Sequence, residues 1–208
     1  MTHRRLTGRV VAATHNAGKL RELRELLHPH GLEVVGAGEL GLAEPEETGS
    51  TFAANAEIKA RAAVAVVGLP ALADDSGLCV EALGGAPGIY SARVALEQGG
   101  FAGAMAYLER ELVACAAPRP WRAYFVSALA LVWPDGHLEA FEDRVDGRLE
   151  FPARGAHGFG YDPIFIPDGH SLGFGEMTSH EKHGLPADGS RALSHRARAF
   201  QALAQACL

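Results

Sequence analysis

The chain is organised around one stretch, Leu72-Ala-Asp-Asp-Ser-Gly-Leu-Cys-Val-Glu81, in which a short apolar run leads into two carboxylates, a hydroxyl and a glycine. We expect a strand that ends here and presents Asp74, Asp75 and Ser76 to solvent, where they could hold a divalent cation and activate a water molecule. Neighbouring side chains on a strand alternate between its faces, so the two carboxylates need not meet one ion. A solvated turn or a helix cap is the plainer alternative.

Hydrophobic patterning on either side of this stretch predicts an α/β fold. Short apolar runs indicate strands at 9–13, 33–36, 121–133, 138–145 and 163–166. Helical spacing of apolar residues predicts helices at 20–28, 52–67, 101–114 and from 194 onward. The run at 121–133 is apolar on both faces, which is typical of a strand inside a sheet. With an irregular loop expected at 168–190, the pattern implies a single domain, residues 1–208, built on a long mixed sheet flanked by helices.

The composition restricts the class of partner. The 208 residues are 48% hydrophobic and 21% charged, as in a globular protein, and the formal net charge is −6. An acidic chain argues against a nucleic-acid polymer as the main partner but leaves small anionic ligands open. The three cysteines, Cys79, Cys115 and Cys207, form no CxxC pair, and no run of about 20 apolar residues is present. We therefore expect a cytoplasmic protein with free thiols and no membrane association.

A candidate phosphate site follows the first predicted strand, in the segment Thr14-His-Asn-Ala-Gly-Lys19. The exposed amides of a helix N-terminus attract anions, and Lys19 adds a full positive charge. The segment is not a P-loop, because no glycine lies five residues before Gly18 and Leu20 replaces the Ser or Thr of that motif. On this local pattern a phosphate cradle and a plain strand-to-helix turn are both open.

Two further groups could support an acidic centre. Three glutamates, Glu44, Glu46 and Glu47, precede the second helix and could supply another oxygen ligand, although a solvated acidic loop has the same composition. Asn55 and Lys59 are four residues apart and therefore share one face of that helix, where they could bind carboxylates or phosphates. An exposed polar helix face is the plain alternative for this pair.

Two more segments could recognise a ring system. The loop Gly158-Phe-Gly-Tyr-Asp162 offers aromatic rings for stacking and a carboxylate as acceptor, or it is a turn with core aromatics. Ser194-His-Arg196 opens the last helix, where His195 and Arg196 could contact a base carbonyl or phosphates, or where Ser194 simply caps the helix. Neither segment is specific by itself.

Together these segments resemble the inosine triphosphate pyrophosphatase family. The matching segments occur in family order and span nearly the whole chain: 13–19, 46–49, Thr51-Phe52, Asn55-Ala56, Lys59-Ala60, 73–77, Gly84-Gly-Ala-Pro-Gly-Ile-Tyr-Ser-Ala-Arg93, 158–163 and 194–196. The resemblance implies an elongated α/β fold of two lobes with an active-site cleft between them, and a homodimer. It also implies Mg²⁺-dependent hydrolysis of ITP, dITP and XTP to the monophosphate and pyrophosphate, which clears deaminated purines from the nucleotide pool.

The resemblance also implies a role for each matched residue. Asp75 is the expected general base and a metal ligand, Glu47 is a metal ligand, and Asp74 belongs to the same metal site. Residues expected to hold the triphosphate are Thr14, His15, Asn16, Ala17, Gly18, Lys19 and Lys59. Residues expected to contact the rest of the substrate are Ser76, Phe159, Gly160, Tyr161, Asp162, Lys182, His195 and Arg196. Arg196 and the backbone amides near Phe159 would donate to a 6-oxo group, which adenine lacks.

The sequence departs from the family pattern at three points. Ala54 stands where the family usually has Glu, and His15 where it often has Gly or Asn. Lys182 precedes His195 by thirteen residues instead of about five, because residues 184–190 form an inserted loop. These departures leave two alternatives open: a nucleotide-binding module without hydrolysis, and the same chemistry on a different nucleotide whose base pocket is reshaped by residues 168–190.

Overall fold

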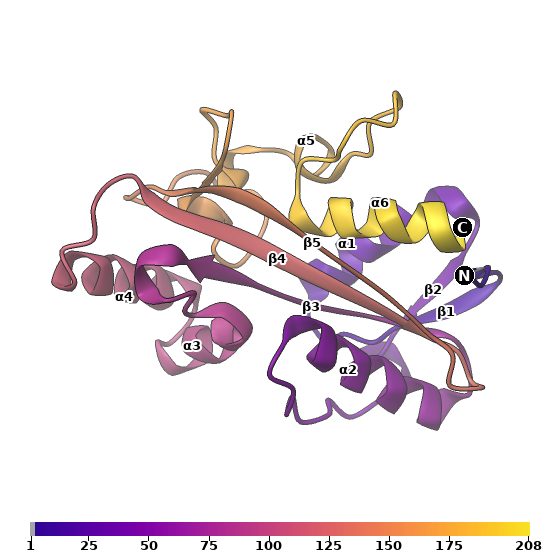
Figure 1. The fold of residues 1–208 in the computed structure, drawn as a ribbon. Helices are drawn as coiled ribbons and strands as arrows, with labels where there is room; N and C mark the ends of the chain where they lie inside the picture. The colour runs from indigo at the N-terminus through magenta and orange to yellow at the C-terminus, as the bar shows by residue number, and fades with distance from the viewer. Residues whose placement is uncertain (1–2) are drawn as a thin grey trace.

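The computed structural model describes residues 3–208, and its six strands there belong to one sheet of order β2-β1-β3-β4-β5-β6. The strands are β1 (Arg9–Ala12), β2 (Glu33–Gly36), β3 (Ala71–Val80), β4 (Trp121–Val132), β5 (Leu138–Leu149) and β6 (Phe165–Pro167). β1 is parallel to β2 and β3, whereas β3, β4, β5 and β6 are successively antiparallel. The predicted mixed α/β fold is confirmed, and β4 and β5 run along its length (Figure 1). The two-lobed arrangement stays a prediction.

Helices cover both faces of this sheet. They are α1 (Ala17–Leu27), α2 (Phe52–Val67), α3 (Ser91–Glu97), α4 (Phe101–Ala114), α5 (Ser179–His183) and α6 (His195–Cys207). α1 and α6 pack together on one face and α2 packs on the opposite face, while α3 and α4 lie at the end away from the two termini (Figure 1). No helix within residues 3–208 is long and apolar enough to cross a membrane.

β4 joins the two layers. Val126, Ala128 and Ala130 pack with α2, and Leu129 and Leu131 pack with α1 and α6 on the other face. All of these side chains are buried, as the apolar pattern on both faces predicts. Full burial of a Val or Leu side chain contributes about 1.5–3 kcal/mol, so Val126, Leu129 and Leu131 help to hold the two layers together.

The edge of β3 is open beyond its first two residues on the β1 side. β1 pairs only with Ala71 and Leu72 of β3, and the chain then turns away into α1. Residues 73–80 of β3 continue past the carboxyl end of β1, and a backbone bond from Ala13 N to Leu72 O (2.8 Å) marks the last shared position. Ligands of α/β proteins bind at such carboxyl ends, outside the sheet.

The expectation that the strand ends at Asp74–Ser76 and exposes them is wrong. β3 runs on to Val80 because β4 pairs with it along its whole length, from Ala71↔Val132 to Val80↔Ala123. Asp74 and Asp75 are therefore buried in mid-strand, 1% and 5% exposed. The tertiary pairing outweighs the local polar pattern.

Other element boundaries also differ from the predictions. The first helix begins at Ala17 rather than Leu20, because Asn16 caps it. The strand predicted at 138–145 extends to Leu149, and the one predicted at 163–166 is β6, preceded by a 3₁₀ turn. α5 lies inside the segment expected to be an irregular loop, and α3 was not predicted at all.

Candidate active site

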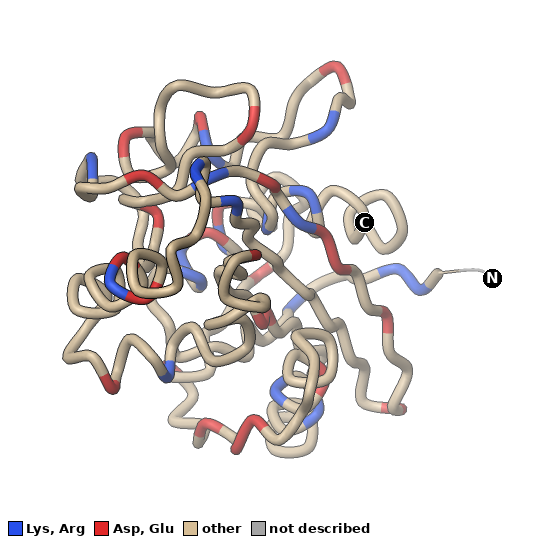
Figure 2. The backbone as a smooth tube through the Cα atoms, turned by 60° about the vertical axis from the view of Figure 1, so that its left-hand side comes forward, with Lys and Arg blue, Asp and Glu red and all other residues tan. Residues whose placement is uncertain are grey.

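A pocket of about 340 Å³ lies at the open edge of β3. Its walls come from the turn before α1, the loop before α2, β3, the loop 158–162, α5 and the start of α6. Because the edge is open there, side chains from both faces of the strand can reach one cavity. Figure 2 shows the positions of Lys and Arg interleaved with those of Asp and Glu along the backbone.

The turn before α1 forms a cationic end of the pocket. The Asn16 side chain accepts from Lys19 N (3.0 Å) and caps the helix. Lys19 Nζ lies 3.0 Å from Asp74 Oδ1 and also donates to the backbone oxygen of Asp74 (3.3 Å). Burial lowers the pKa of Lys19, although Asp74 partly counteracts this. A Cβ at Gly18 would lie 2.6 Å from the Phe159 ring, so a glycine lets that ring cover the turn.

An acidic centre lies on the α2 side of β3. Lys59 Nζ is 2.6 Å from Asp75 Oδ1 and 2.9 Å from Glu47 Oε1, and Asn55 Nδ2 is 3.5 Å from Asp75 Oδ2. Asn55 and Lys59 are both buried, so the alternative of an exposed helix face is wrong. Burial raises the pKa of Asp75 even though Lys59 opposes the shift. A buried carboxylate with a raised pKa is a typical proton acceptor.

The residues present fit a hard divalent cation. Glu47 and Asp75 converge on the Lys59 ammonium and also line the pocket with Glu44, so carboxylate oxygens face a shared space. Within residues 3–208 no group of three or more His, Cys, Asp and Glu side chains is arranged to hold a metal. The two carboxylates Glu47 and Asp75 would be enough to hold Mg²⁺, which takes one or two carboxylates and completes its shell with water and phosphate oxygens.

Asp74 lies on the opposite face of β3, beneath α6. Its Oδ2 accepts from Arg196 Nε (2.7 Å) and from Ser127 Oγ (2.9 Å). Burial disfavours its charge, yet Arg196 and Lys19 hold the pKa of Asp74 well below its usual range. Asp74 does not line the pocket, and its assignment as a metal ligand stays a prediction. The alternation of β3 thus separates the two adjacent carboxylates.

Arg196 is fully buried and joins several elements. In addition to its hydrogen bond with Asp74, Arg196 binds Glu22 of α1 through Nη1 and donates from Nη2 to Ser76 Oγ (3.0 Å). Burial opposes its charge, but Asp74 and Glu22 raise the pKa of Arg196 above its usual value. Sequence reasoning missed Glu22, because a glutamate among charged helix residues carries no local signal that it is buried.

The loop 158–162 is held by its own carboxylate. Asp162 Oδ2 accepts from Phe159 N (2.9 Å) and from Lys182 Nζ (2.6 Å). The Phe159 amide therefore has an acceptor within its own loop, and donation to a 6-oxo group by the backbone amides near Phe159 stays a prediction. The Lys182 ammonium lies 5.6 Å from the centre of the Phe159 ring, which packs that ring over the pocket.

His195 stacks on Phe125 with ring centres 4.9 Å apart and an angle of 13°. Burial, with Arg196 and Lys182 nearby, holds the pKa of His195 well below its usual value, so the ring is neutral. Its Nδ1 is buried and has no hydrogen-bond partner among residues 3–208, although His195 lines the pocket. A buried polar atom without a partner in a pocket wall indicates a hydrogen bond to a ligand.

The inserted loop leaves the pocket intact. Ser194 N donates to Lys182 O (3.2 Å), so the two ends of the segment 183–193 lie next to each other. Lys182 and His195 consequently line the same pocket despite the thirteen-residue spacing. The segment between these two residues does not line the pocket, and its interpretation as an insertion stays a prediction.

The pocket brings together most of the predicted site residues. Those that line it are Thr14, His15, Asn16, Lys19, Glu47, Lys59, Asp75, Ser76, Phe159, Gly160, Tyr161, Asp162, Lys182, His195 and Arg196. Those that do not are Asp74, Ala17 and Gly18. Phe101 and Phe125 also line it, but their apolar periodicity indicated only core positions.

This arrangement defines an α/β protein with a pocket lined by cationic, acidic and aromatic side chains. The chain belongs to the Ham1 family, whose sequence model matches residues 10–206. It is 63% identical to the dITP/XTP pyrophosphatase of Rhodopseudomonas palustris, over 99% of each chain. It is 61% identical to the dITP/XTP pyrophosphatase of Bradyrhizobium sp. strain BTAi1, over 100% of this chain and 97% of the relative.

Solved structures agree with this assignment. A HAM1 protein from Coxiella burnetii superimposes with a TM-score of 0.78 at 34% identity, covering 96% of this chain and 98% of that one. The Ham1 protein of Staphylococcus aureus gives a TM-score of 0.77 at 32% identity, covering 95% and 98%.

Proposed function

We propose that the protein hydrolyses the deaminated purine nucleoside triphosphates ITP, dITP and XTP to the monophosphate and pyrophosphate, with Mg²⁺ as cofactor, in the cytoplasm. At the coarser level, the chain is an enzyme, a nucleoside triphosphate pyrophosphohydrolase, as the names of its relatives support. The observation that carries the proposal is the buried Asp75, whose carboxylate faces Lys59 and Glu47 inside a cavity lined by Lys19 and Arg196.

Each end of the pocket has a separate task in this reaction. Lys19, Lys59 and the α1 N-terminus would bind the triphosphate and oppose its negative charge. Asp75 would take the proton of the attacking water, for which its raised pKa suits it. Mg²⁺, held by Glu47 and Asp75, would supply charge neutralisation at the phosphates. Asp74 would act indirectly, by fixing Lys19 and Arg196.

The choice of base would fall to His195 and Arg196. The neutral His195 ring and the Arg196 guanidinium can donate hydrogen bonds to a 6-oxo group, and the Phe159 ring can cover the purine. An adenine 6-amino group cannot accept these hydrogen bonds, so the buried donors would lose their partners. Rejection by unpaired donors is stronger than rejection by size.

A substrate panel tests the proposal. With purified protein and Mg²⁺, pyrophosphate release from dITP and XTP should exceed that from ATP by at least about a hundredfold in kcat/KM, because adenine lacks the 6-oxo acceptor. Release from GTP, which keeps the 6-oxo group, should also be lower, and this comparison measures selectivity at position 2 of the purine. Chelating the cation with EDTA should stop turnover, and added Mg²⁺ should restore it. Tight ITP binding without pyrophosphate release would instead favour the non-hydrolysing module, and a maximum on another nucleotide would contradict the substrate assignment.

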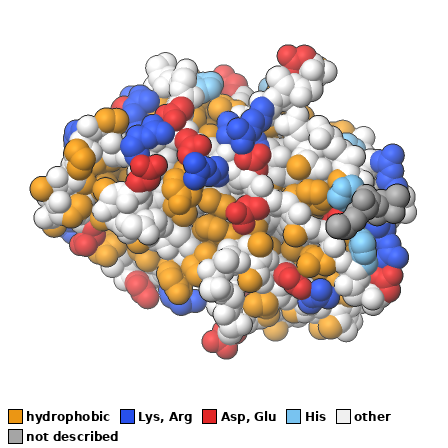
Figure 3. All heavy atoms as spheres, in the orientation of Figure 1, with side chains coloured by type: hydrophobic (Ala, Val, Ile, Leu, Met, Phe, Trp, Pro, Cys, Tyr) orange, Lys and Arg blue, Asp and Glu red, His pale blue; other side chains and the backbone are white. Residues whose placement is uncertain are grey.

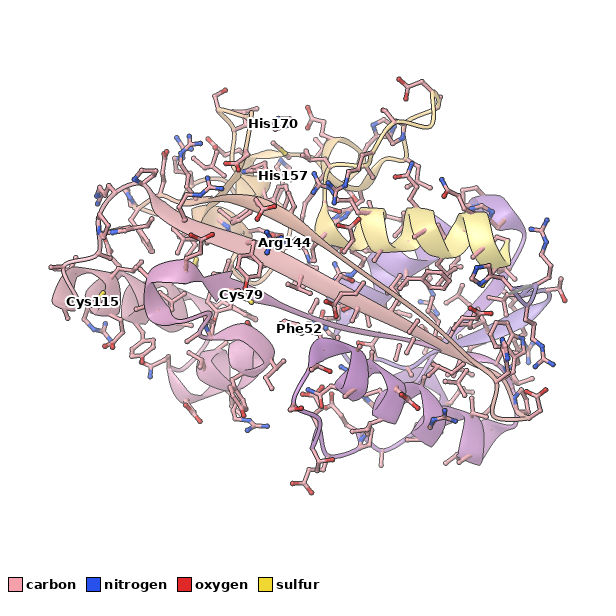
Figure 4. The ribbon with its side chains drawn as sticks, viewed as in Figure 1. Phe52, Cys79, Cys115, Arg144, His157 and His170 are labelled. Carbon is pink, nitrogen blue, oxygen red and sulfur yellow. The ribbon has the colours of Figure 1, made fainter. Side chains whose placement is uncertain are left out.

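We also propose that two copies associate through the α2 face of the sheet, in support of the implied homodimer. Cys79, Ile89, Tyr124 and Val126 line a hollow of about 590 Å³ there. Figure 3 shows hydrophobic side chains gathered on this face, and Figure 4 labels Phe52, Cys79 and Arg144 around it. Ile89 and Tyr124 are partly exposed in this hollow, and Glu142, Asp143 and Arg144 also line it. Apolar side chains beside a polar rim are typical of protein interfaces.

Sedimentation equilibrium tests this association. The wild type should sediment at twice the 21.9 kDa chain mass, and Tyr124→Glu, which places a charge in the hollow, should shift it to the chain mass. Val113→Glu on α4 is the matched control, because Val113 is exposed and lies outside the hollow. A wild type of single chain mass would contradict the proposal.

A further inference from the structure

Three buried side chains from three elements form one hydrogen-bonded line beside the pocket. His183, the last residue of α5, lies with Nε2 2.7 Å from Glu22 Oε1 of α1 and with Nδ1 2.9 Å from Ser194 Oγ. Ser194 is the N-cap of α6. All three are at most 5% exposed, and neither Glu22, His183 nor Ser194 lines the substrate pocket.

The proton positions along this line follow from its ends. Arg196 holds the pKa of Glu22 below its usual value despite burial, so the carboxylate is ionised and accepts from His183 Nε2–H. In the neutral ring Nδ1 then accepts from Ser194 Oγ, which itself accepts from Ala197 N (3.2 Å). The charged groups that face His183 are Glu22, Lys182 and Arg196, and burial lowers the pKa of His183 in spite of Glu22. A neutral ring of one fixed tautomer thus satisfies every member of the line.

The two ends of this hydrogen-bonded line contact His195 and Arg196, the residues proposed to select the base. At one end, Glu22 binds Arg196 Nη1, so the side chain that fixes Arg196 is itself fixed by His183. At the other end, Ser194 caps the helix whose first two residues are His195 and Arg196. Ser194 Oγ is fully buried and serves as a cap, so the Ser–His–Glu arrangement is not a nucleophile with its base.

We propose that Glu22, His183 and Ser194 are positioning residues that aim Arg196 and His195 at the purine, and thereby set the selectivity for 6-oxo bases. This inference rests on the proposed function. Without the hydrogen bond from His183, that oxygen of Glu22 would still have the Lys182 ammonium as a charged neighbour, at 3.9 Å. Glu22 would turn toward Lys182, and Arg196 would follow it. Asp75, on the opposite face of β3, would keep its contacts with Lys59.

The experiment compares dITP with dATP, which differ in their 6-substituent. For His183→Asn and Glu22→Gln, the ratio of kcat/KM for dITP over dATP should fall by about tenfold, through a higher KM for dITP and with kcat nearly unchanged. His180→Asn and Glu25→Gln are matched controls, because they are exposed residues of the same two helices. The ratio should be unchanged in both controls.

Variants of Ser194 distinguish a positioning role from an effect on folding stability alone. Ser194→Thr keeps the hydroxyl and should retain the wild-type selectivity, whereas Ser194→Ala should lower both the melting temperature and the selectivity. A variant that lowers only the melting temperature, with the dITP/dATP ratio intact, would overturn the proposal. So would full selectivity in His183→Asn.

A measurement on the wild type is independent of the variants. The ¹⁵N shifts of His183 should report the neutral Nε2–H tautomer near pH 7 and a bonded Nδ1, and a Nδ1–H tautomer would overturn the proposed line. A wild type that fails to hydrolyse dITP would contradict the proposed function instead. The two failures are therefore distinguishable.

Discussion

Replacing Asp75 by Asn is expected to lower kcat by about 10²–10⁴-fold, because the amide cannot accept the proton of the attacking water. The change is isosteric, and Lys59 keeps its ion pair with Glu47 (2.9 Å), so the melting temperature should change little. Pyrophosphate release under saturating dITP and Mg²⁺ measures kcat, and thermal unfolding measures stability.

Asp168→Asn is the control for this substitution. Asp168 is an exposed aspartate that pairs with Arg122 at 2.7 Å, far from the pocket lining. It should keep wild-type kcat. An Asp75→Asn variant that retains more than a tenth of the wild-type kcat would exclude Asp75 as the general base, whatever its effect on metal affinity.

Replacing Arg196 by Met should have the largest effect on stability. Met fills a similar volume without charge, so Asp74 and Glu22 would stay buried without the guanidinium that now binds both. Breaking such a buried ion pair costs about 3–5 kcal/mol. For a chain of this size that corresponds to a fall in melting temperature of about 10 °C.

The pH dependence of this loss follows from the depressed pKa values of both carboxyl groups. Asp74 and Glu22, whose pKa values are lowered in the folded state, stabilise it above their unfolded pKa values of about 3.9 and 4.3. This stabilisation is lost as the pH falls. The difference between wild type and Arg196→Met should therefore narrow below about pH 4. Arg122→Met, which breaks only the exposed pair with Asp168, should cost under about 1 kcal/mol at any pH. An equal loss in both variants would contradict the network.

The strands and long helices could be predicted because their patterns are local. The alternation from Trp121 to Trp133 places each side chain of β4 on the face that the structure gives it. α3 and α5, with seven and five residues, are too short to show helical periodicity, and tertiary contacts decide their boundaries. The length of β3 could not be predicted from its own sequence either, because it depends on pairing with β4.

The site was predictable in its residue types but not in its burial. The Asp-Asp pair, Lys19 and Lys59 could be named from spacing and resemblance, whereas the partner of Asp74 is Arg196, 122 residues away. Glu22 carries no local signal, since its neighbours in α1 include Arg21 and Leu23. Charge pairs between distant segments emerge only when the fold brings them together.

The alternation of β3 has an evolutionary consequence. Asp74 anchors the α6 side and Asp75 faces the α2 side, so residues adjacent in sequence belong to two environments that share few side chains. Substitutions around Glu22, His183 and Arg196 can accumulate on the α6 side without altering the carboxylate that faces Lys59. A lineage can therefore change which nucleotide it accepts while inheriting the hydrolytic step unchanged.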